Sequence, residues 1–276
     1  MAKPIKIEIL GDSKSFSNAI ENSIGGLSKL TGRASVAGKK IAQGIAVGVA
    51  GVAAGAGASI SAAMDFEKSM GEVFTLMPGI SGAAMDEMNA QVGKFSQEFG
   101  VLPDEVVPAL YAALSAGVPA DTVFDYMETA TKLATGGVTD LDTAVDGLSS
   151  VVNAYGADII SSAEASDIMF TAVKFGKTTV DEIASSISNV TPIASALGVG
   201  FDEIGASIAV LTAAGVPTAS ATTMMKGAMA ELGKENSIAD KAFRELAGKG
   251  FTQFIAEGGN LTDGLMLMAD GAEAAG

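Results

Sequence analysis

The chain has 276 residues and contains no histidine, cysteine or tryptophan. Without His and Cys it cannot build a zinc site of nitrogen and sulfur ligands, a cysteine nucleophile or a Ser-His-Asp triad. Its formal net charge is −15, with 17 Lys and Arg against 32 Asp and Glu. Tight binding of DNA or RNA is therefore not expected, because neutralising phosphates requires clustered cations.

The first 40 residues are predicted to be a basic region of one strand and one helix. Isoleucine recurs at every second position from Ile5 to Ile9, and this period of two predicts a short β-strand over residues 3–11. The apolar positions of residues 16–30 predict a weak helix. Seven Lys and Arg but only three Asp and Glu lie in this region, so the remaining chain has 10 cationic and 29 acidic residues.

Residues 41–64 are predicted to form an Ala- and Gly-rich helix that carries no charge. The segment is long enough to cross a bilayer. Four glycines give it two Gly-x-x-x-Gly spacings, which allow close helix crossing: Gly44, Gly48, Gly51 and Gly55. Ala and Gly contribute little to membrane insertion, and Leu and Phe are absent from the segment. We therefore favour a helix packed against other helices in water, with membrane insertion as the open alternative.

Residues 65–250 are predicted to be a helical core. Apolar residues recur at helical spacing in several stretches. Examples are Val123, Tyr126, Met127, Ala130 and Leu133, and then Leu141, Ala144, Val145, Leu148, Val151, Val152 and Tyr155. At four expected helix starts a Ser or Thr precedes an acid by three residues, which is the spacing of a capping box: Thr139, Ser161, Thr179 and Ser237.

Five Gly-Val pairs mark expected helix ends in the core. Each pair follows an apolar periodic run. Gly suits the left-handed residue that follows a helix, and Val can fold back on the last turn. We predict helix C-caps at Gly100, Gly117, Gly137, Gly198 and Gly215. The joints are short, so neighbouring helices are expected to form antiparallel hairpins.

Two stretches that contain these joints form a faint internal repeat. Residues 100–119 and 198–217 align at an offset of 98, and eight of the twenty aligned positions are identical. The alignment predicts a duplicated helical hairpin. No shorter period recurs, so a solenoid is not supported.

Residues 251–276 are expected to differ from the core. Phe251, Phe254 and Ile255, followed by a Gly-rich turn, predict an extended segment and a possible small β-hairpin over residues 251–261. A further helix is expected to begin near Thr262 and to continue beyond residue 276. The chain is thus predicted to be all-α, a bundle of short antiparallel helical hairpins with one short N-terminal strand and this possible hairpin.

Four pairs of adjacent acids could serve a hydrolase or bind Mg²⁺. They are Asp86-Glu87, Asp104-Glu105, Asp181-Glu182 and Asp202-Glu203. All four pairs are expected in the first turn of a helix, where negative charge complements the helix macrodipole. Helix capping therefore accounts for them, and we predict no catalytic residue, no metal site and no cofactor.

An ordered series of motifs in the middle of the chain resembles the core region of phage tail tape-measure proteins. The motifs are residues 63–70, 100–105, 114–117, 132–135, 153–156, 175–182, 191–198, 211–215 and 250–261. Each motif is weak alone, and the specificity lies in their order over roughly residues 63–265. The sequence departs from the family pattern at residues 221–223, where a glycine is common.

The resemblance implies a non-catalytic structural protein of the virion. Such a protein would occupy the lumen of the tail tube, nucleate tube assembly in the host cytoplasm, help to set tail length and leave ahead of DNA at infection. The implied partners are the tail tube (major tail) protein, tail assembly chaperones, tail tip or baseplate hub proteins, and further copies of the chain in a homo-oligomer. Two alternatives are a membrane-active helical protein that inserts residues 41–64 into the host membrane and a carboxylate-based cell-wall hydrolase.

Overall fold

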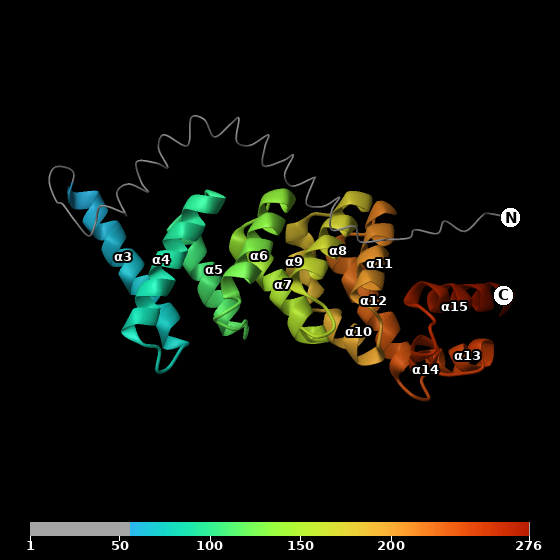
Figure 1. The fold of residues 1–276 in the computed structure, drawn as a ribbon. Coiled ribbons are helices and arrows are strands. Elements are labelled where there is room, and N and C mark those ends of the chain that lie inside the picture. The colour runs from blue at the N-terminus through green and yellow to red at the C-terminus, as the bar shows by residue number, and fades with distance from the viewer. Residues whose placement is uncertain (1–55, 276) are drawn as a thin grey trace. The chain divides into compact units, whose positions relative to one another are not determined.

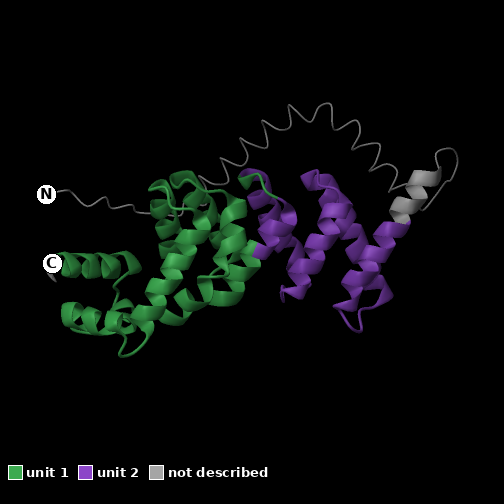
Figure 2. Cartoon of the chain, turned by 180° about the vertical axis from the view of Figure 1, so that it is seen from behind, with its two compact units in different colours: residues 1–12, 137–139, 147–276 green, residues 13–136, 140–146 purple. Residues whose placement is uncertain are grey.

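The computed structural model describes residues 56–275, and every regular element in this range is an α-helix (Figure 1). The all-α prediction is confirmed for this part of the chain. The β-strand predicted over residues 3–11 lies outside the described residues, and so do Gly44, Gly48, Gly51 and Gly55. The chain divides into two compact units, which Figure 2 shows in different colours.

Unit 2 comprises residues 56–136 and 140–146 of the described chain. Its helices are α3 (Ala56–Thr75), α4 (Gly82–Phe99), α5 (Pro103–Ser115), α6 (Val123–Gly137) and the first residues of α7 (Leu141–Tyr155). Helix α5 packs on α3 and α4. The buried Tyr126 hydroxyl of α6 donates a hydrogen bond to the Val145 carbonyl oxygen of α7 at 2.8 Å. A local apolar core therefore forms within this unit, with Val106, Leu110 and Met127 fully buried.

Unit 1 comprises residues 137–139 and 147–275 of the described chain. It holds the end of α7 and then α8 (Ser162–Phe175), α9 (Val180–Ile187), α10 (Thr191–Leu197), α11 (Phe201–Ala213), α12 (Thr218–Gly233), α13 (Ile238–Ala247), α14 (Phe251–Ala256) and α15 (Leu261–Ala275). Its most extensive helix contact joins α8 to α11. A Cβ built on Gly205 of α11 would lie 2.5 Å from Ile168 Cγ2 of α8, so these two helices approach closely only because position 205 has no side chain.

The short joints between helices account for only some of the helix pairs that pack together. Neighbours such as α11 and α12 contact each other, as the hairpin prediction expects. The main partner of α8 is nonetheless α11, three helices further along the chain, and α12 packs on both α9 and α10. Close helix contact requires small residues on the facing surfaces, and their positions, rather than the length of a joint, select these partners.

The possible β-hairpin over residues 251–261 is wrong. Residues 251–256 form helix α14, in which Phe251 and Ile255, four residues apart, are both buried. The following glycines cap the helix: the Gly258 amide donates to the Ile255 carbonyl and the Gly259 amide to the Phe254 carbonyl, at 3.0 and 2.9 Å. The aromatic spacing suits a short buried helix as well as a strand, and contacts with α12, α13 and α15 select the helix.

Candidate functional site: helix joints and polar contacts of the core

Three of the four acid pairs lie in first helical turns, namely those of α5, α9 and α11. The prediction is wrong for Asp86-Glu87, because α4 begins at Gly82 after the Ser81 cap and the pair falls in the second turn. Within the described part of the chain, no three acidic side chains gather closely enough to hold a metal ion. The acids are thus distributed along helix starts and form no metal-binding cluster there.

Four of the five Gly-Val joints have left-handed backbone at the glycine. The φ angle is +71° at Gly100, +94° at Gly117, +77° at Gly198 and +93° at Gly215. In the last three joints the Gly amide bonds to the carbonyl three residues back, and the Val amide to the carbonyl five residues back, at 2.9–3.1 Å. These paired bonds are the Schellman motif, which satisfies the free carbonyl groups at a helix end. Val199 then folds back and is fully buried.

The fifth joint differs, and the prediction of a cap at Gly137 is wrong. Gly137 is the last residue of α6, and the left-handed residue is Val138, with a φ of +54°. A Cβ on Gly137 would lie 2.3 Å from Val180 Cγ2, so packing rather than backbone conformation excludes a side chain there. Val138 is left 91% exposed, and a β-branched residue in this conformation is strained.

Helix starts in unit 1 are capped by side chains at the expected positions. Ser161 Oγ accepts from the Glu164 amide at 3.2 Å, and Glu164 Oε2 accepts from the Ser161 amide at 2.9 Å, which completes a capping box. These bonds hold the pKa of Glu164 below its usual value. Thr179 caps α9 through the Glu182 amide. The Thr139 hydroxyl instead donates to the Asp181 carboxylate at 3.4 Å.

A buried tyrosine joins α7 to the turn after α10. The Tyr155 hydroxyl donates to the Val199 carbonyl oxygen at 3.0 Å, and its ring meets Phe201 edge-on at a centroid distance of 6.0 Å. Burial, together with the nearby Asp202 and Glu203 charges, raises the pKa of Tyr155. The hydroxyl therefore stays protonated and keeps its role as a donor.

A threonine joins α11 to the turn after α8. Thr212 Oγ1 donates to the Ile208 carbonyl at 2.7 Å and accepts from the Lys177 amide at 3.1 Å. A Cβ on the adjacent Gly176 would lie 2.4 Å from the same Oγ1, so only glycine leaves room for this contact. Thr212 is 1% exposed, and its hydrogen bonds offset the cost of burying the hydroxyl.

A second hydroxyl cluster joins α9 to the start of α12. Thr218 Oγ1 donates to Glu182 Oε2 at 2.8 Å and lies 2.7 Å from Thr178 Oγ1. The Thr178 hydroxyl also lies 3.2 Å from the same carboxylate oxygen. Glu182 thus has two roles. Its negative charge lies in the first turn of α9, where it complements the helix macrodipole, and its carboxylate accepts a hydrogen bond from Thr218, the first residue of α12.

Glu203 connects the starts of two helices. Its carboxylate accepts from the Gly200 amide at 3.3 Å and from the Leu261 amide, the first residue of α15. Burial raises the pKa of Glu203, and the two amide bonds partly offset this effect. The side chain therefore holds α15 against the N-terminal end of α11.

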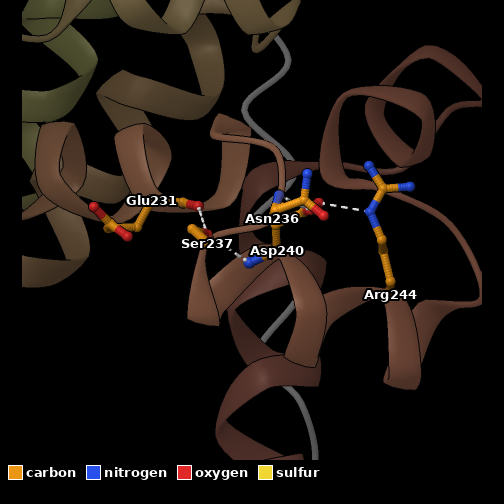
Figure 3. A network of polar contacts seen from close by, with 5 residues as sticks. All are labelled: Glu231, Asn236, Ser237, Asp240 and Arg244. Carbon is orange, nitrogen blue, oxygen red and sulfur yellow. Dashed lines mark hydrogen bonds and ion pairs between the residues drawn. The ribbon is translucent and has the colours of Figure 1, made fainter.

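The start of α13 is held by the network drawn in Figure 3. Asp240 is almost fully buried; its backbone amide donates to Ser237 Oγ at 2.9 Å, and its carboxylate accepts from the Asn236 amide and from Arg244 Nε at 2.9 and 2.8 Å. Ser237 Oγ in turn donates to the Glu231 carbonyl at 2.5 Å. Arg244, followed by the Asn236 amide, holds the pKa of Asp240 below its usual value.

The comparison with known proteins bears directly on this helical region. The family model of phage-related minor tail proteins matches residues 89–275. The chain belongs to this family. It is 31% identical over 269 residues to a "Probable tape measure protein" of Clostridium phage phiCD119, and 25% identical over 212 residues to a "Tape measure protein" of Pneumococcus phage Dp-1. The resemblance to tape-measure proteins is therefore confirmed, and a structural role in the phage tail follows from it.

The chain spans only part of these relatives. The two alignments cover 92% and 76% of this chain but 28% and 18% of the respective relatives. No solved structure matches. Among the described residues, no helix is long and apolar enough to span a membrane. The membrane-insertion candidates Gly44, Gly48, Gly51 and Gly55 lie outside that range.

The motifs that carry the family resemblance contact one another in unit 1. Tyr155, from the motif at residues 153–156, bonds to Val199, which follows the motif at residues 191–198. Lys177, from the motif at residues 175–182, bonds through its amide to Thr212, from the motif at residues 211–215. Sequence analysis placed a helix start at Thr179 and helix ends at Gly198 and Gly215 within these motifs, but it did not foresee their mutual contacts.

Proposed function

We propose that this chain is a folded structural module of a tape-measure protein that occupies the lumen of the tail tube. In this role it nucleates tube assembly, helps to set tail length and leaves ahead of DNA at infection. The observation that carries the proposal is a pair of tertiary hydrogen bonds made by residues in or next to family motifs, Tyr155 to Val199 and Lys177 to Thr212. Polar groups that bond to neighbouring helices stabilise the fold, which suits a structural scaffold. Catalysis forms no part of the proposed role.

The partners follow from the proposed role. We expect the tail tube protein, tail assembly chaperones and tail tip or baseplate hub proteins to bind the module, and several copies to associate in one tail. The acidic chain, with a net charge of −15, suits a lumen that DNA must pass without binding. In the proposed division of the chain, residues 65–250 are the core, residues 1–40 and 41–64 precede it, and residues 251–276 begin the next segment.

A compact folded module can nucleate assembly of the tail tube, whereas a ruler that measures tail length must be extended. A continuous helix adds ~1.5 Å per residue, so sixteen residues of an extended ruler correspond to ~24 Å of tail. The helices of each compact unit fold back on one another, and such units do not convert residue number into length in this way. The module would therefore help to set tail length by starting the tube, and the extended ruler would lie in other parts of the tape-measure protein.

Deleting residues 140–155 from the phage gene tests this function. The deletion removes α7, including the buried Leu141, Leu148 and Val151, and we expect few or no tails, because the unfolded module cannot nucleate the tube. Gly215→Val is the matched variant, since backbone strain at this position lowers the stability of the same module without changing chain length. Electron micrographs of particles from both strains give tail number and length. Abundant tails that are uniformly ~24 Å shorter in the deletion strain alone would contradict the proposal.

A further inference from the structure

Helices of the two units begin and end at equivalent positions. Helix α5 begins 98 residues before α11, and both have 13 residues. At the same offset α4 covers residues 82–99, and α9 and α10 together cover residues 180–197. Lys94 of α4 stands where α10 has Pro192, and a proline cannot continue the interior of a helix. One continuous helix in unit 2 therefore corresponds to two short helices in unit 1.

The same helical elements pack together in the two units. The first packs on the third, α3 on α5 and α8 on α11, and the second packs on the third, α4 on α5 and α10 on α11. The third helix ends in the same pair of hydrogen bonds, made by the amides of Gly117 and Val118 in unit 2 and of Gly215 and Val216 in unit 1. The likeness therefore extends well beyond the twenty residues that align in the sequence.

The first helices, α3 and α8, match at an offset of 99. Two buried residues of α3 have buried counterparts in α8 at this spacing: Met70 with Met169, and Val73 with Ala172. The joint that follows the first helix is longer in unit 2, where it covers residues 76–81, than in unit 1, where it covers residues 176–179. The longer joint accounts for the change of offset from 99 to 98.

The contact between the first and third helices differs in how side-chain volume is divided. In unit 1, Ile168 of α8 lies against Gly205 of α11, where a Cβ would come within 2.5 Å of Ile168 Cγ2. The offsets of 99 and 98 place Ser69 of α3 and Val107 of α5 at these two positions. Val107 is 3% exposed, and Ser69 is half-buried. A large residue is thus paired with glycine in unit 1, and a small residue with valine in unit 2, so the total volume changes little.

We propose that residues 64–119 and 163–217 are two tandem copies of one three-part helical unit. In this unit Ser69 contacts Val107 across α3 and α5, as Ile168 contacts Gly205 across α8 and α11. The exchange of large and small side chains keeps both helix pairs at packing distance. The proposal is independent of the function proposed above, because it concerns only the internal construction of the two units.

Exchanging side chains in unit 2 of the full chain tests the proposal. Ser69→Ile should lower the urea midpoint, because the larger side chain meets Val107. Val107→Gly should also lower it, since the substitution leaves a cavity. The double variant recreates the pair found in unit 1, so its urea midpoint should be higher than those of both single variants. Any other order of the three midpoints would overturn the proposal.

Val106→Gly supplies the matched control. Val106 is also fully buried in α5, but it corresponds to Ile204 and not to Gly205. Ser69→Ile combined with Val106→Gly should have a urea midpoint below those of both single variants, because the two losses add. Recovery in this control pair as well would mean that Ser69 is not paired with Val107, and the proposal would be wrong.

Hydrogen exchange measured by mass spectrometry gives a local readout of the same contact. Exchange in residues 103–115 should be at least about tenfold faster in Ser69→Ile than in the parent chain. In the double variant with Val107→Gly it should return to within about threefold of the parent rate. Equal exchange in the parent and in Ser69→Ile would show that residue 69 does not face α5, and this result would also overturn the proposal.

Discussion

Helices α5 in unit 2 and α11 in unit 1 have the same length and end in the same pair of Schellman hydrogen bonds. Their surroundings differ. At the offset of 98, Thr212 and Thr218 of unit 1 correspond to Leu114 and Ala120 of unit 2. The hydroxyl contacts of unit 1 thus cannot form at these positions in unit 2. The comparison teaches that local backbone chemistry sets where a helix ends, whereas individual side chains decide how firmly it is held to its partner.

The largest expected effect concerns the contact between α8 and α11, the most extensive helix contact of unit 1. Val107 of α5 occupies the position of Gly205 of α11, and both are buried. We expect Gly205→Val to lower the free energy of unfolding by about 2–3 kcal/mol, because the new side chain meets Ile168 of α8. Urea denaturation of the full chain measures the change. Gly227→Ala in α12, where no atom lies within 4 Å, is the control and should stabilise by about 0.5–1 kcal/mol.

A medium effect should be the same in both units. Gly117→Val and Gly215→Val each place a β-branched residue at a φ above +90°, and each should cost about 1–2 kcal/mol. Neither position has an atom within 4 Å of the added Cβ, so backbone strain is the whole cause. Urea melts of the two variants should agree. A clear difference between them would show that the two joints are not equivalent.

A smaller effect should be confined to unit 1. Thr218 is 3% exposed and donates to Glu182, so Thr218→Val should cost about 1 kcal/mol through the lost hydrogen bond. Thr218→Ser retains the hydroxyl and should recover most of this loss. Ala120→Ser at the corresponding position of unit 2 should change stability little, because Ala84 there offers no carboxylate. If the Val and Ser variants at position 218 are equally stable, the hydroxyl cluster does not contribute.

The smallest effect should be a gain in stability. Val138 has a φ of +54° and is exposed, so Val138→Gly relieves strain without removing a buried contact. We expect thermal unfolding to show an increase of about 0.5–1 kcal/mol. Gly137→Val next to it should act in the opposite direction, because Val180 already fills that space. A loss of stability in Val138→Gly would mean that the valine side chain is held by a contact.

Sequence patterns predicted the helical core and several helix ends because those depend on neighbours in the chain. Ser161 and Glu164 are three residues apart, so their capping box is visible in the sequence. The same reasoning failed at Gly137, where contact with Val180, 43 residues away, moved the left-handed residue to Val138. It also failed at residues 251–261, since aromatic spacing alone does not distinguish a short helix from a strand.

By itself, the sequence determined the exclusion of His- and Cys-based sites, the helical period of the core and four of the five glycine joints, because each depends on residue type or local spacing. The tertiary structure alone decided that α8 packs on α11, that Tyr155 reaches Val199, and that Glu203 joins α11 to α15. These contacts link residues 37–58 positions apart, and no local pattern encodes such distances. They depend on which faces are small enough to approach, and that becomes defined only when the helices pack.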